Sequence, residues 1–399
     1  MTDLSGQPWL NDVATVAVLD ALEAAGGPGC VRFVGGCVRN ALMAQPVDDI
    51  DLSTTLPPEA VIAALKAAGL KSVPTGLAHG TVTAIARRQP FEITTLRRDV
   101  STDGRNATVA FTDDWGEDAA RRDFRLNALY ADRTGRIFDP TGEGLADAAA
   151  GRIVFVGDPA TRIQEDYLRI LRFFRFQAWY GRGDADAAGL AACTALHPGM
   201  ARLSAERVSK ELLKLLAAPD PRPAVRAMSD TGVLGQIMPV PVSLVRFEAM
   251  VAVSDDVALR LSALLPVATE AVMKAAVALR LSNALRNRLI DAVSKRVVPT
   301  ASGADIRAML YRAERQAVLD RLARTAADHP DADLGELCAI ARDWPIPRLP
   351  VGGREVAQAG VAAGPDTGRI LKAFEDSWIA DDFPTDGHEA RLRGLVAAG

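Results

Sequence analysis

The sequence predicts an α+β protein, with a small mixed sheet in the first 140 residues and an all-α remainder. Two observations predict this class. Short apolar runs alternate with helical patterns up to about residue 140, and beyond about residue 145 Ala, Leu and Arg dominate in segments separated by Pro or Gly. A chain of 399 residues is also too long for one ordinary core, so we expect about two to four domains.

Composition narrows the class of protein further. Hydrophobic residues make up 49% of the chain, and the formal net charge is −4. No apolar run reaches ~18 residues, so no membrane span is expected, and the N-terminus lacks the pattern of a secretory signal. The cysteines form no zinc-type pair and no disulfide framework; they are Cys30, Cys37, Cys193 and Cys338. We therefore expect a cytoplasmic protein whose affinity for RNA, if it has any, comes from placed arginines instead of bulk charge.

The elements expected in the first 140 residues follow in order. They are a helix over Val13–Ala25, a strand over Val31–Val34, a glycine turn, a helix over Val38–Ala44, an acidic strand over Ile50–Thr54, a helix over Val61–Ala68, paired strands over Thr81–Ala86 and Phe91–Leu96, a loop over Asp99–Asp114, and a helix and a strand through Arg122–Tyr130.

The rest of the chain is expected to be helical. One apolar stripe at helical spacing predicts a single helix over Thr161–Tyr180. A second helix is expected over Ser204–Ala217, with Ser204 as its cap, and Pro219–Pro223 should end it. Residues 241–399 show helical patterns with Pro and Gly punctuation.

Two aspartates on the acidic strand suggest a metal site. Asp49 and Asp51 are two residues apart, so on a strand their side chains point to the same face. Magnesium prefers oxygen ligands and often lies between carboxylates and substrate phosphates. Glu92, on the neighbouring strand, is the candidate third carboxylate. An Asp-rich turn and a solvated edge charge are the structural alternatives for these residues.

The glycine turn before the acidic strand could hold phosphates. Gly35 and Gly36 allow close approach of the backbone, and Arg39 follows on the next helix. The sequence has no Walker loop and no complete dinucleotide fingerprint. Further on, Arg122 can meet a phosphate and Asp123 can accept a hydrogen bond from a ribose hydroxyl. A plain turn and a surface ion pair remain open for each motif alone.

Asp166 and Arg169 form the candidate base-reading pair, since residues at i and i+3 are neighbours on one helix face. Cytosine and adenine both present an exocyclic amine beside an unprotonated ring nitrogen. An aspartate accepts from the amine and an arginine donates to the nitrogen, whereas guanine and uracil reverse that pattern. A helix-surface ion pair is the alternative.

Taken together and in this order, the motifs resemble those of class II tRNA nucleotidyltransferases and poly(A) polymerases, a family of the DNA polymerase β superfamily. The matching segments are Gly35-Gly36-Cys37-Val38-Arg39 with Asp49-Ile50-Asp51-Leu52, Arg121-Arg122-Asp123-Phe124 with Asn127-Ala128-Leu129, Glu165-Asp166 with Arg169, Leu171-Arg172 and Arg175-Phe176, and Ala205-Glu206-Arg207 with Glu211-Leu212.

The resemblance implies a catalytic nucleotidyltransferase head at 1–140, a helical neck and body with a base-reading helix at 141–240, and a helical body and tail that binds tRNA at 241–399. It implies that Asp49 and Asp51 bind Mg²⁺ with Glu92 as third acid, and that Gly35, Gly36 and Arg39 hold the triphosphate of CTP or ATP. It also implies that Arg122 and Asp123 contact the nucleotide, and that Asp166 and Arg169 read the base.

The implied activity is CCA addition to tRNA 3′ ends, with poly(A) polymerase or partial, A-only or CC-only addition as the alternatives within the family. The chain has Pro74–Thr83 where bacterial poly(A) polymerases typically carry an arginine-rich stretch, so it looks like the tRNA branch. The segment Asp99–Asp114 matches the flexible loop linked to the switch from C to A.

The chain departs from the family pattern at two positions near these motifs. Asn40 stands where Asp is usual, and we expect a structural adjustment there. Arg125 stands where Thr is usual and is expected to add a positive charge near the nucleotide. A non-catalytic RNA-binding protein and a metal-dependent phosphohydrolase are the rivals from other classes, and oligomeric state is left open.

Overall fold

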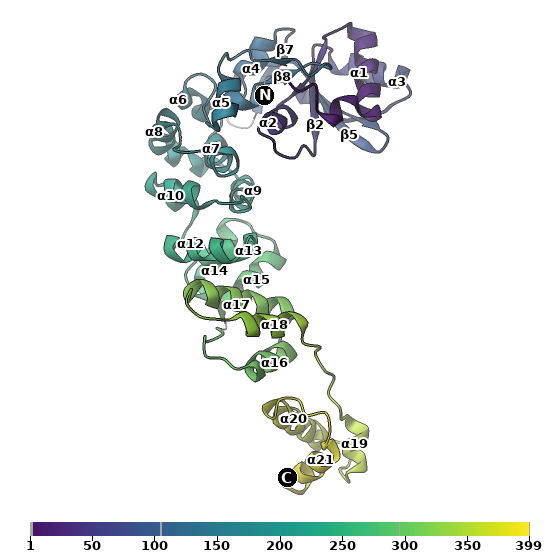
Figure 1. The fold of residues 1–399 in the computed structure, drawn as a ribbon, viewed down its shortest axis with the longest axis vertical. Coiled ribbons are helices and arrows are strands. Elements are labelled where there is room, and N and C mark those ends of the chain that lie inside the picture. The colour runs from purple at the N-terminus through teal and green to yellow at the C-terminus, as the bar shows by residue number, and fades with distance from the viewer. Residues whose placement is uncertain (1–2, 104–105, 295, 399) are drawn as a thin grey trace. The chain divides into compact units, whose positions relative to one another are not determined.

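A computed structural model describes residues 3–103, 106–294 and 296–398 (Figure 1). These residues form two compact units. Unit 1 comprises Met1–Pro239 with Ala278–Arg280, and unit 2 comprises Val240–Val277 with Leu281–Gly399. The mixed sheet lies in unit 1, and the described part of unit 2 is helical. This architecture confirms the α+β class that the sequence predicts.

Unit 1 begins with alternating helices and strands and continues with helices. Its elements are η1 (Pro8–Asn11), α1 (Val13–Gly26), β1 (Val31–Val34), α2 (Gly36–Leu42), β2 (Ile50–Thr54), α3 (Pro58–Ala67), β3 (Lys71–Gly76), η2 (Leu77–His79), β4 (Thr81–Ala86), β5 (Gln89–Thr95), β6 (Arg97–Asp103), β7 (Asn106–Phe111), α4 (Trp115–Ala120), η3 (Arg125–Asn127), β8 (Tyr130–Ala131), β9 (Ile137–Phe138), α5 (Gly144–Ala150), α6 (Pro159–Glu165), α7 (Leu168–Tyr180), α8 (Ala187–Leu196), η4 (His197–Arg202), α9 (Ala205–Leu216), α10 (Arg222–Asp230) and α11 (Val233–Ile237).

Seven strands form one mixed sheet in the order β3-β4-β5-β2-β1-β8-β9. The central strand β2 runs antiparallel to β1 and parallel to β5, with Asp51 in register with Glu92. Apolar side chains of these strands, such as Phe33, Leu52 and Ile93, are fully or almost fully buried. The acidic residues therefore lie at the middle of the sheet, between strands that are fixed on both sides.

An aromatic cluster packs helix α7 onto the sheet domain within unit 1. The ring centroids of Phe124 and Phe176 lie 5.0 Å apart, and those of Phe155 and Phe173 lie 5.5 Å apart and stack. Phe124, Phe155 and Phe173 are fully buried. Burial of each ring contributes about 1.5–3 kcal/mol, so the cluster fixes α7 beside the residues that follow α4.

Unit 2 is built from short helices. They are α12 (Leu244–Val253), α13 (Val257–Leu264), α14 (Thr269–Ala278), α15 (Asn283–Ser294), α16 (Gly303–Arg312), α17 (Arg315–Asp328), α18 (Gly335–Asp343), α19 (Gly353–Gln358), α20 (Pro365–Ala380) and α21 (His388–Ala398).

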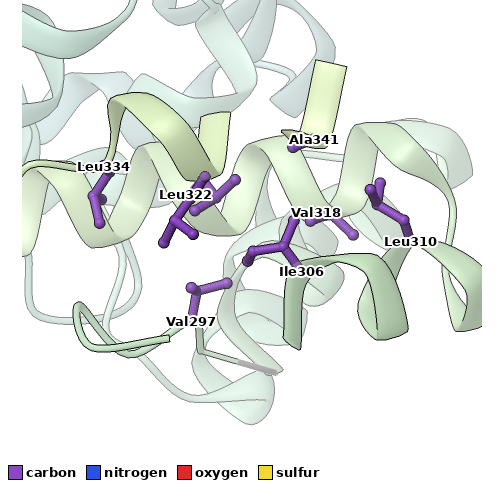
Figure 2. Close-up of a cluster of buried hydrophobic side chains, with 8 residues drawn as sticks. Val297, Ile306, Leu310, Val318, Leu322, Leu334 and Ala341 are labelled. Atoms are coloured by element: carbon purple, nitrogen blue, oxygen red, sulfur yellow. The ribbon is translucent and has the colours of Figure 1, made fainter. Parts of the chain in front are cut away.

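One core of unit 2 lies among α16, α17 and α18 (Figure 2). Ile306, Val318 and Leu322 are fully buried there, and Ala341 of α18 packs against the same cluster. A second core joins α19, α20 and α21 around Val356 and Phe374. Each core is local to a few consecutive helices, as in other helical assemblies.

The structure corrects three of the element predictions. The loop expected over Asp99–Asp114 is instead largely the antiparallel hairpin β6–β7, although Gly104 and Arg105 lie outside the described residues. The single helix expected over Thr161–Tyr180 is two helices, α6 and α7, separated at Asp166. Ser204 stands at the start of α9, but its side chain makes no capping hydrogen bond. Strand β3 is an additional element that the sequence analysis did not predict.

No single helix in the described ranges is long and apolar enough to cross a membrane, while the bent pair α13 and α14 together meet the length and composition that a span requires.

Candidate active site

The backbone of the turn between β1 and α2, at Gly35 and Gly36, lies beside the guanidinium groups of Arg122 and Arg39. Gly35 has φ of +68°, in the left-handed region that favours glycine. A Cβ added at Gly35 would lie 3.8 Å from Nη1 of Arg122, and one at Gly36 would lie 4.0 Å from Nη2 of Arg39. Glycine therefore permits the turn and keeps the space beside both arginines open.

The three candidate acids lie near one another at the centre of the sheet. Asp51 on β2 is half-buried and in register with Glu92 on β5, whose side chain is exposed, and Asp49 directly precedes β2 and is also exposed. Burial, together with repulsion from Glu92 and then Asp49, raises the pKa of Asp51 to about 6, although Arg122 and Arg39 oppose this shift. Negative charge is therefore concentrated at the centre of the sheet.

This donor set fits a divalent cation that shares its ligands with a substrate. Among the described residues, no group of three or more His, Cys, Asp or Glu side chains is arranged to hold a metal ion on its own. The mutual repulsion at Asp51 is nevertheless what a nearby cation would relieve. Two or three carboxylate oxygens would then leave positions for phosphate oxygens and water.

An open pocket of about 320 Å³ gathers the remaining candidate residues. Seven of the residues singled out in the sequence line it; these are Gly35, Gly36, Arg39, Arg122, Asp123, Asp166 and Arg169. Asp49, Asp51 and Glu92 are not among the lining residues. The pocket holds five arginines and two aspartates, so its charge favours an anionic ligand such as a triphosphate.

Arg122 connects the pocket to the acidic strand. Its Nη2 donates to Oγ of Ser53, at 3.2 Å, and to Oδ2 of Asp118, at 2.9 Å. Ser53 lies two residues after Asp51 on β2, so Arg122 lies beside the carboxylates. Asp118 is fully buried, and burial would raise its pKa, but Arg122 and Arg121 outweigh that effect and lower the pKa to about 2. This ionised carboxylate fixes both arginines at the wall of the pocket.

Asp123 is held by α7, the helix that carries Arg169. Its Oδ2 accepts from Nε of Arg172, at 2.8 Å, and its Oδ1 accepts from Nδ2 of Asn127, at 2.9 Å. Burial would raise the pKa of Asp123, but Arg172, Asn127 and the backbone N–H of Phe124 lower it to about 2. The carboxylate thus ties α7 to the segment after α4 at the wall of the pocket.

The break between α6 and α7 places Asp166 in extended conformation at the pocket. Its Oδ1 accepts from the backbone N–H of Leu168, at 3.1 Å, and its Oδ2 accepts from Nη2 of Arg207, at 2.6 Å. Each carboxylate oxygen keeps acceptor capacity after these bonds. Arg207 belongs to α9, so two elements fix the orientation of this side chain.

Arg169 is the second residue of α7 and is anchored mainly through one nitrogen. Nη1 donates to Glu165 and to the carbonyl oxygen of Arg162, and Nη2 donates to the carbonyl oxygen of Arg121, at 3.2 Å. Within the described ranges, Nε–H and the second Nη2–H have no hydrogen-bond partner. These donors remain for a base in the pocket. The backbone N–H of Arg169 donates to the carbonyl oxygen of Asp166, at 3.0 Å, but their side chains are not bonded to each other.

Four further residues line the pocket without having been assigned a role from the sequence; they are Arg121, Asn127, Arg172 and Phe176. Arg172 and Phe176 follow Arg169 by three and seven residues, so helical spacing alone could have identified them. Arg125, by contrast, was expected near the nucleotide, and the structure corrects this. Its guanidinium pairs with Glu143 and lines a different pocket, of about 240 Å³.

Two family models match the chain. One describes the head domain of poly(A) polymerase and covers residues 31–154. The other describes a probable RNA- and SrmB-binding site of polymerase A and covers residues 186–243. The first range contains the glycine turn, the acids and Arg122 with Asp123.

Relatives match most of the chain. It is 32% identical to the human protein named CCA tRNA nucleotidyltransferase 1, mitochondrial, over 90% of this chain and 85% of that protein. It is 30% identical to a Streptococcus gordonii protein named CCA-adding enzyme, over 92% of this chain and 93% of that protein.

Solved structures share the fold. The Bacillus stearothermophilus CCA-adding enzyme, determined in complex with CTP, superposes with a TM-score of 0.77 at 24% identity, covering 98% of each chain. The Thermotoga maritima CCA-adding enzyme, determined with tRNA, superposes with a TM-score of 0.70 at 17% identity, covering 99% of this chain and 98% of that one.

Proposed function

This chain belongs to the class II family of CCA-adding tRNA nucleotidyltransferases and poly(A) polymerases, and we propose from this premise how its pocket performs template-independent CCA addition. The chain is an enzyme that acts on tRNA and uses CTP and ATP. In each cycle the 3′-hydroxyl oxygen of the tRNA forms a bond to the α-phosphorus of the nucleotide. The bond between that phosphorus and the bridging oxygen to the β-phosphate breaks, and pyrophosphate leaves.

The glycine turn and two arginines hold the triphosphate in this proposal. Gly35 and Gly36 let phosphate oxygens approach the backbone N–H groups at the start of α2, and Arg39 and Arg122 flank that space. The excess of arginines over aspartates in the pocket supports this role, because charge-assisted hydrogen bonds to phosphate are about twice as strong as neutral ones.

The carboxylates hold the ions of the reaction. Enzymes of this family generally use divalent metal ions, and we propose Mg²⁺, held by Asp49 and Asp51 with Glu92 as third acid. When bound, such ions lower the pKa of the attacking hydroxyl and neutralise charge on the leaving pyrophosphate. The position of Asp51 supports the assignment. Burial is the main cause of its raised pKa, but Glu92 and Asp49 add to the shift, and neighbouring carboxylates of this kind attract a cation.

Asp166 and Arg169 select the base. Asp166 accepts from the exocyclic amine of cytosine or adenine, while Arg169 donates from Nε or Nη2 to the neighbouring ring nitrogen. Guanine and uracil would set a carbonyl oxygen against the carboxylate, which leaves buried polar groups unpaired. Asp123 contacts the ribose, and its bond to Arg172 on α7 fixes the sugar site relative to the base site.

The remaining assignments concern whole regions. Residues 1–140 form the catalytic head, 141–240 the neck and body with the base-reading residues, and 241–399 the body and tail that bind tRNA. We propose a cytoplasmic location; because the human relative is named as mitochondrial, fractionation of the source cells would test it directly.

One observation carries this proposal: a single pocket is lined both by residues suited to binding phosphate and by residues suited to reading a base. They come from segments more than a hundred positions apart, from Gly35 to Arg169. The test incubates the full chain with tRNA lacking its 3′ end, Mg²⁺ and each labelled nucleotide in turn, then sequences the products. We expect C, C and A to be added in that order and addition then to stop. A tail of A residues without prior C addition, or no incorporation, would contradict the proposal.

A further inference from the structure

Arg39 is a buried cation whose hydrogen-bond partners are all neutral. Its side chain is among the buried charged groups, with a relative exposure of 8%. Nη1 donates to Oδ1 of Asn127, at 2.6 Å, and Nη2 donates to the hydroxyl of Tyr180, at 2.9 Å. Nε and Nη2 both donate to Oδ1 of Asn40, at 3.1 and 2.8 Å. Within the described part of the chain it forms no ion pair with a carboxylate.

The count of donors leaves one N–H for a ligand. A guanidinium has five N–H groups, and these four bonds use four of them. The fifth is on Nη1, and Arg39 lines the pocket that holds the glycine turn. Asp123 and Asp51 act on Arg39 only through space, without a hydrogen bond to it. Three neutral partners therefore hold the guanidinium and leave one donor at the pocket.

Asn40 uses both ends of its amide at this position. While its Oδ1 accepts from Arg39, its Nδ2 donates to the carbonyl oxygen of Pro46, at 2.7 Å. The two neighbours fix the orientation of the amide, because the guanidinium has no acceptor and the carbonyl has no donor. An aspartate would keep the first contact, lose the second and place a full negative charge against Arg39.

Tyr180 supports Arg39 from the end of α7. Its ring centroid lies 4.2 Å from the guanidinium carbon, in addition to the hydrogen bond from Nη2 to its hydroxyl. Phe176 of the same helix presents its ring at 5.1 Å. Stacking of this kind stabilises the cation without neutralising it, so the helix that carries Arg169 also holds Arg39.

We propose that Asn40 is a positioning residue for phosphate binding, which together with Tyr180 holds Arg39 through neutral contacts so that its whole charge acts on the β- and γ-phosphates of the nucleotide and on pyrophosphate. This inference rests on the proposed function, in which Arg39 contacts the triphosphate. It gives the departure from the family motif at Asn40 a role in substrate affinity, in addition to its local structural contacts.

The test compares Asn40→Asp with Asn40→Ala in the full chain. Both variants lose the bond to Pro46, but only the aspartate adds a charge beside Arg39. Calorimetry with Mg²⁺-pyrophosphate and with Mg²⁺-CTP measures affinity, and steady-state kinetics measure KM and kcat. We expect Asn40→Asp to weaken pyrophosphate binding by about 5- to 30-fold, the range for one charge-assisted contact. The KM for CTP and ATP should rise in parallel, whereas kcat and base selectivity should change little. Asn40→Ala removes the bonds that hold Arg39 but adds no negative charge, so it should weaken binding by a clearly smaller factor than Asn40→Asp does.

Arg39→Ala separates failure of this inference from failure of the proposed function. If Arg39→Ala binds pyrophosphate as the wild type does, the phosphate role of Arg39 is wrong and the inference falls with it. If Arg39→Ala loses binding while Asn40→Asp retains it, or if Asn40→Ala weakens binding as much as Asn40→Asp, only the role of Asn40 is overturned. Thermal unfolding of each variant verifies that the fold is retained.

Discussion

At the scale of single residues, charge explains more of this site than shape does. Arginines with buried or neutral partners line the pocket, and mutually repelling carboxylates stand at the centre of the sheet. Asp51 is the residue on which these two features converge, because Arg122 and Arg39 lower its pKa while Glu92 and Asp49 raise it. The account therefore places the reacting phosphate between the arginines and Asp51.

Asp51→Ala and Asp49→Ala test that placement. Each should reduce nucleotide transfer by at least about 100- to 1,000-fold, the loss typical when one preorganised electrostatic group is removed, while tRNA binding stays nearly intact. The measurement is single-turnover incorporation of labelled CMP, with a gel-shift assay for tRNA. Asp48→Ala is the matched control, because Asp48 is exposed and directly precedes Asp49. Turnover retained by the Asp51 variant would refute its role as a metal ligand.

At the scale of elements, short polar links hold helix α7 to the sheet domain. The bond between Arg172 and Asp123 is one such link. Tyr167, which directly precedes α7, packs its ring against Gly199 of η4. Both lie within a few residues of the base-reading pair. Small changes in these links should therefore alter stability and selectivity together.

The Asp123–Arg172 link makes stability depend on pH. The folded-state pKa of Asp123 is about 2, below its ordinary value of 3.8, so its contribution is present above pH about 4 and is lost as the pH falls through about 2. A shift of this size corresponds to about 2 kcal/mol. We expect urea unfolding to show a smaller loss of stability between pH 4 and 2 for Asp123→Asn than for the wild type. Asp113→Asn, at an exposed position, is the control, and parallel pH profiles for all three proteins would contradict the link.

Gly199 tests the geometry of the break between α6 and α7. A Cβ at Gly199 would lie 1.9 Å from Cε1 of Tyr167, the neighbour of Asp166. Gly199→Ala should therefore displace the Tyr167 ring, cost about 1–3 kcal/mol of stability and weaken discrimination between CTP and UTP. Gly235→Ala, where a Cβ would meet nothing within 4 Å, should leave both properties unchanged. Equal behaviour of the two variants would show that the ring position does not control the site.

The sequence predicted the elements of the sheet domain well where apolar alternation was strong, as at Val31–Val34 and Ile50–Thr54. It missed the hairpin β6–β7, because Asp, Gly, Asn and Thr are typical of loops and the pairing of the two strands leaves no apolar alternation in the sequence. It also missed the break at Asp166, because the apolar stripe continues on both sides.

The candidate site was predictable where residues that are close in the sequence are also close in the structure. The seven predicted residues that line the pocket all lie in short motifs. The partner of Asp166, Arg207, lies 41 residues away, and that of Arg39, Tyr180, lies 141 residues away. Contacts between such distant positions depend on how helices pack, and no local pattern in one sequence encodes them.

At the scale of the whole molecule, the residues of the pocket that we propose binds the nucleotide all belong to unit 1, and unit 2 has cores of its own. Nucleotide binding should therefore be insensitive to damage in unit 2. The large helical share of the chain is then available for a task other than holding CTP or ATP, and the proposed task is binding tRNA.

Leu322→Ala tests this division of labour. Leu322 is fully buried in the core of α16, α17 and α18 (Figure 2), so truncation should cost about 2–5 kcal/mol. We expect the thermal transition of unit 2 to move to lower temperature while the Kd for Mg²⁺-CTP at 20 °C, measured by calorimetry, is unchanged. Val298→Ala, at a position that is 57% exposed, should leave both unchanged. Loss of CTP affinity in proportion to the loss of stability would contradict the division.

The central claim is that protein side chains, instead of a nucleic-acid template, choose cytosine and adenine, and the base selectivity of Asp166→Ala tests it most directly. The measurement is the rate of incorporation of CTP, ATP, GTP and UTP onto tRNA lacking its 3′ end, for the wild type, for Asp166→Ala and for Glu143→Ala as a control outside the pocket. The account predicts that Asp166→Ala lowers discrimination against GTP and UTP by about 10- to 100-fold, while Glu143→Ala behaves as the wild type. Unchanged selectivity in Asp166→Ala would contradict it.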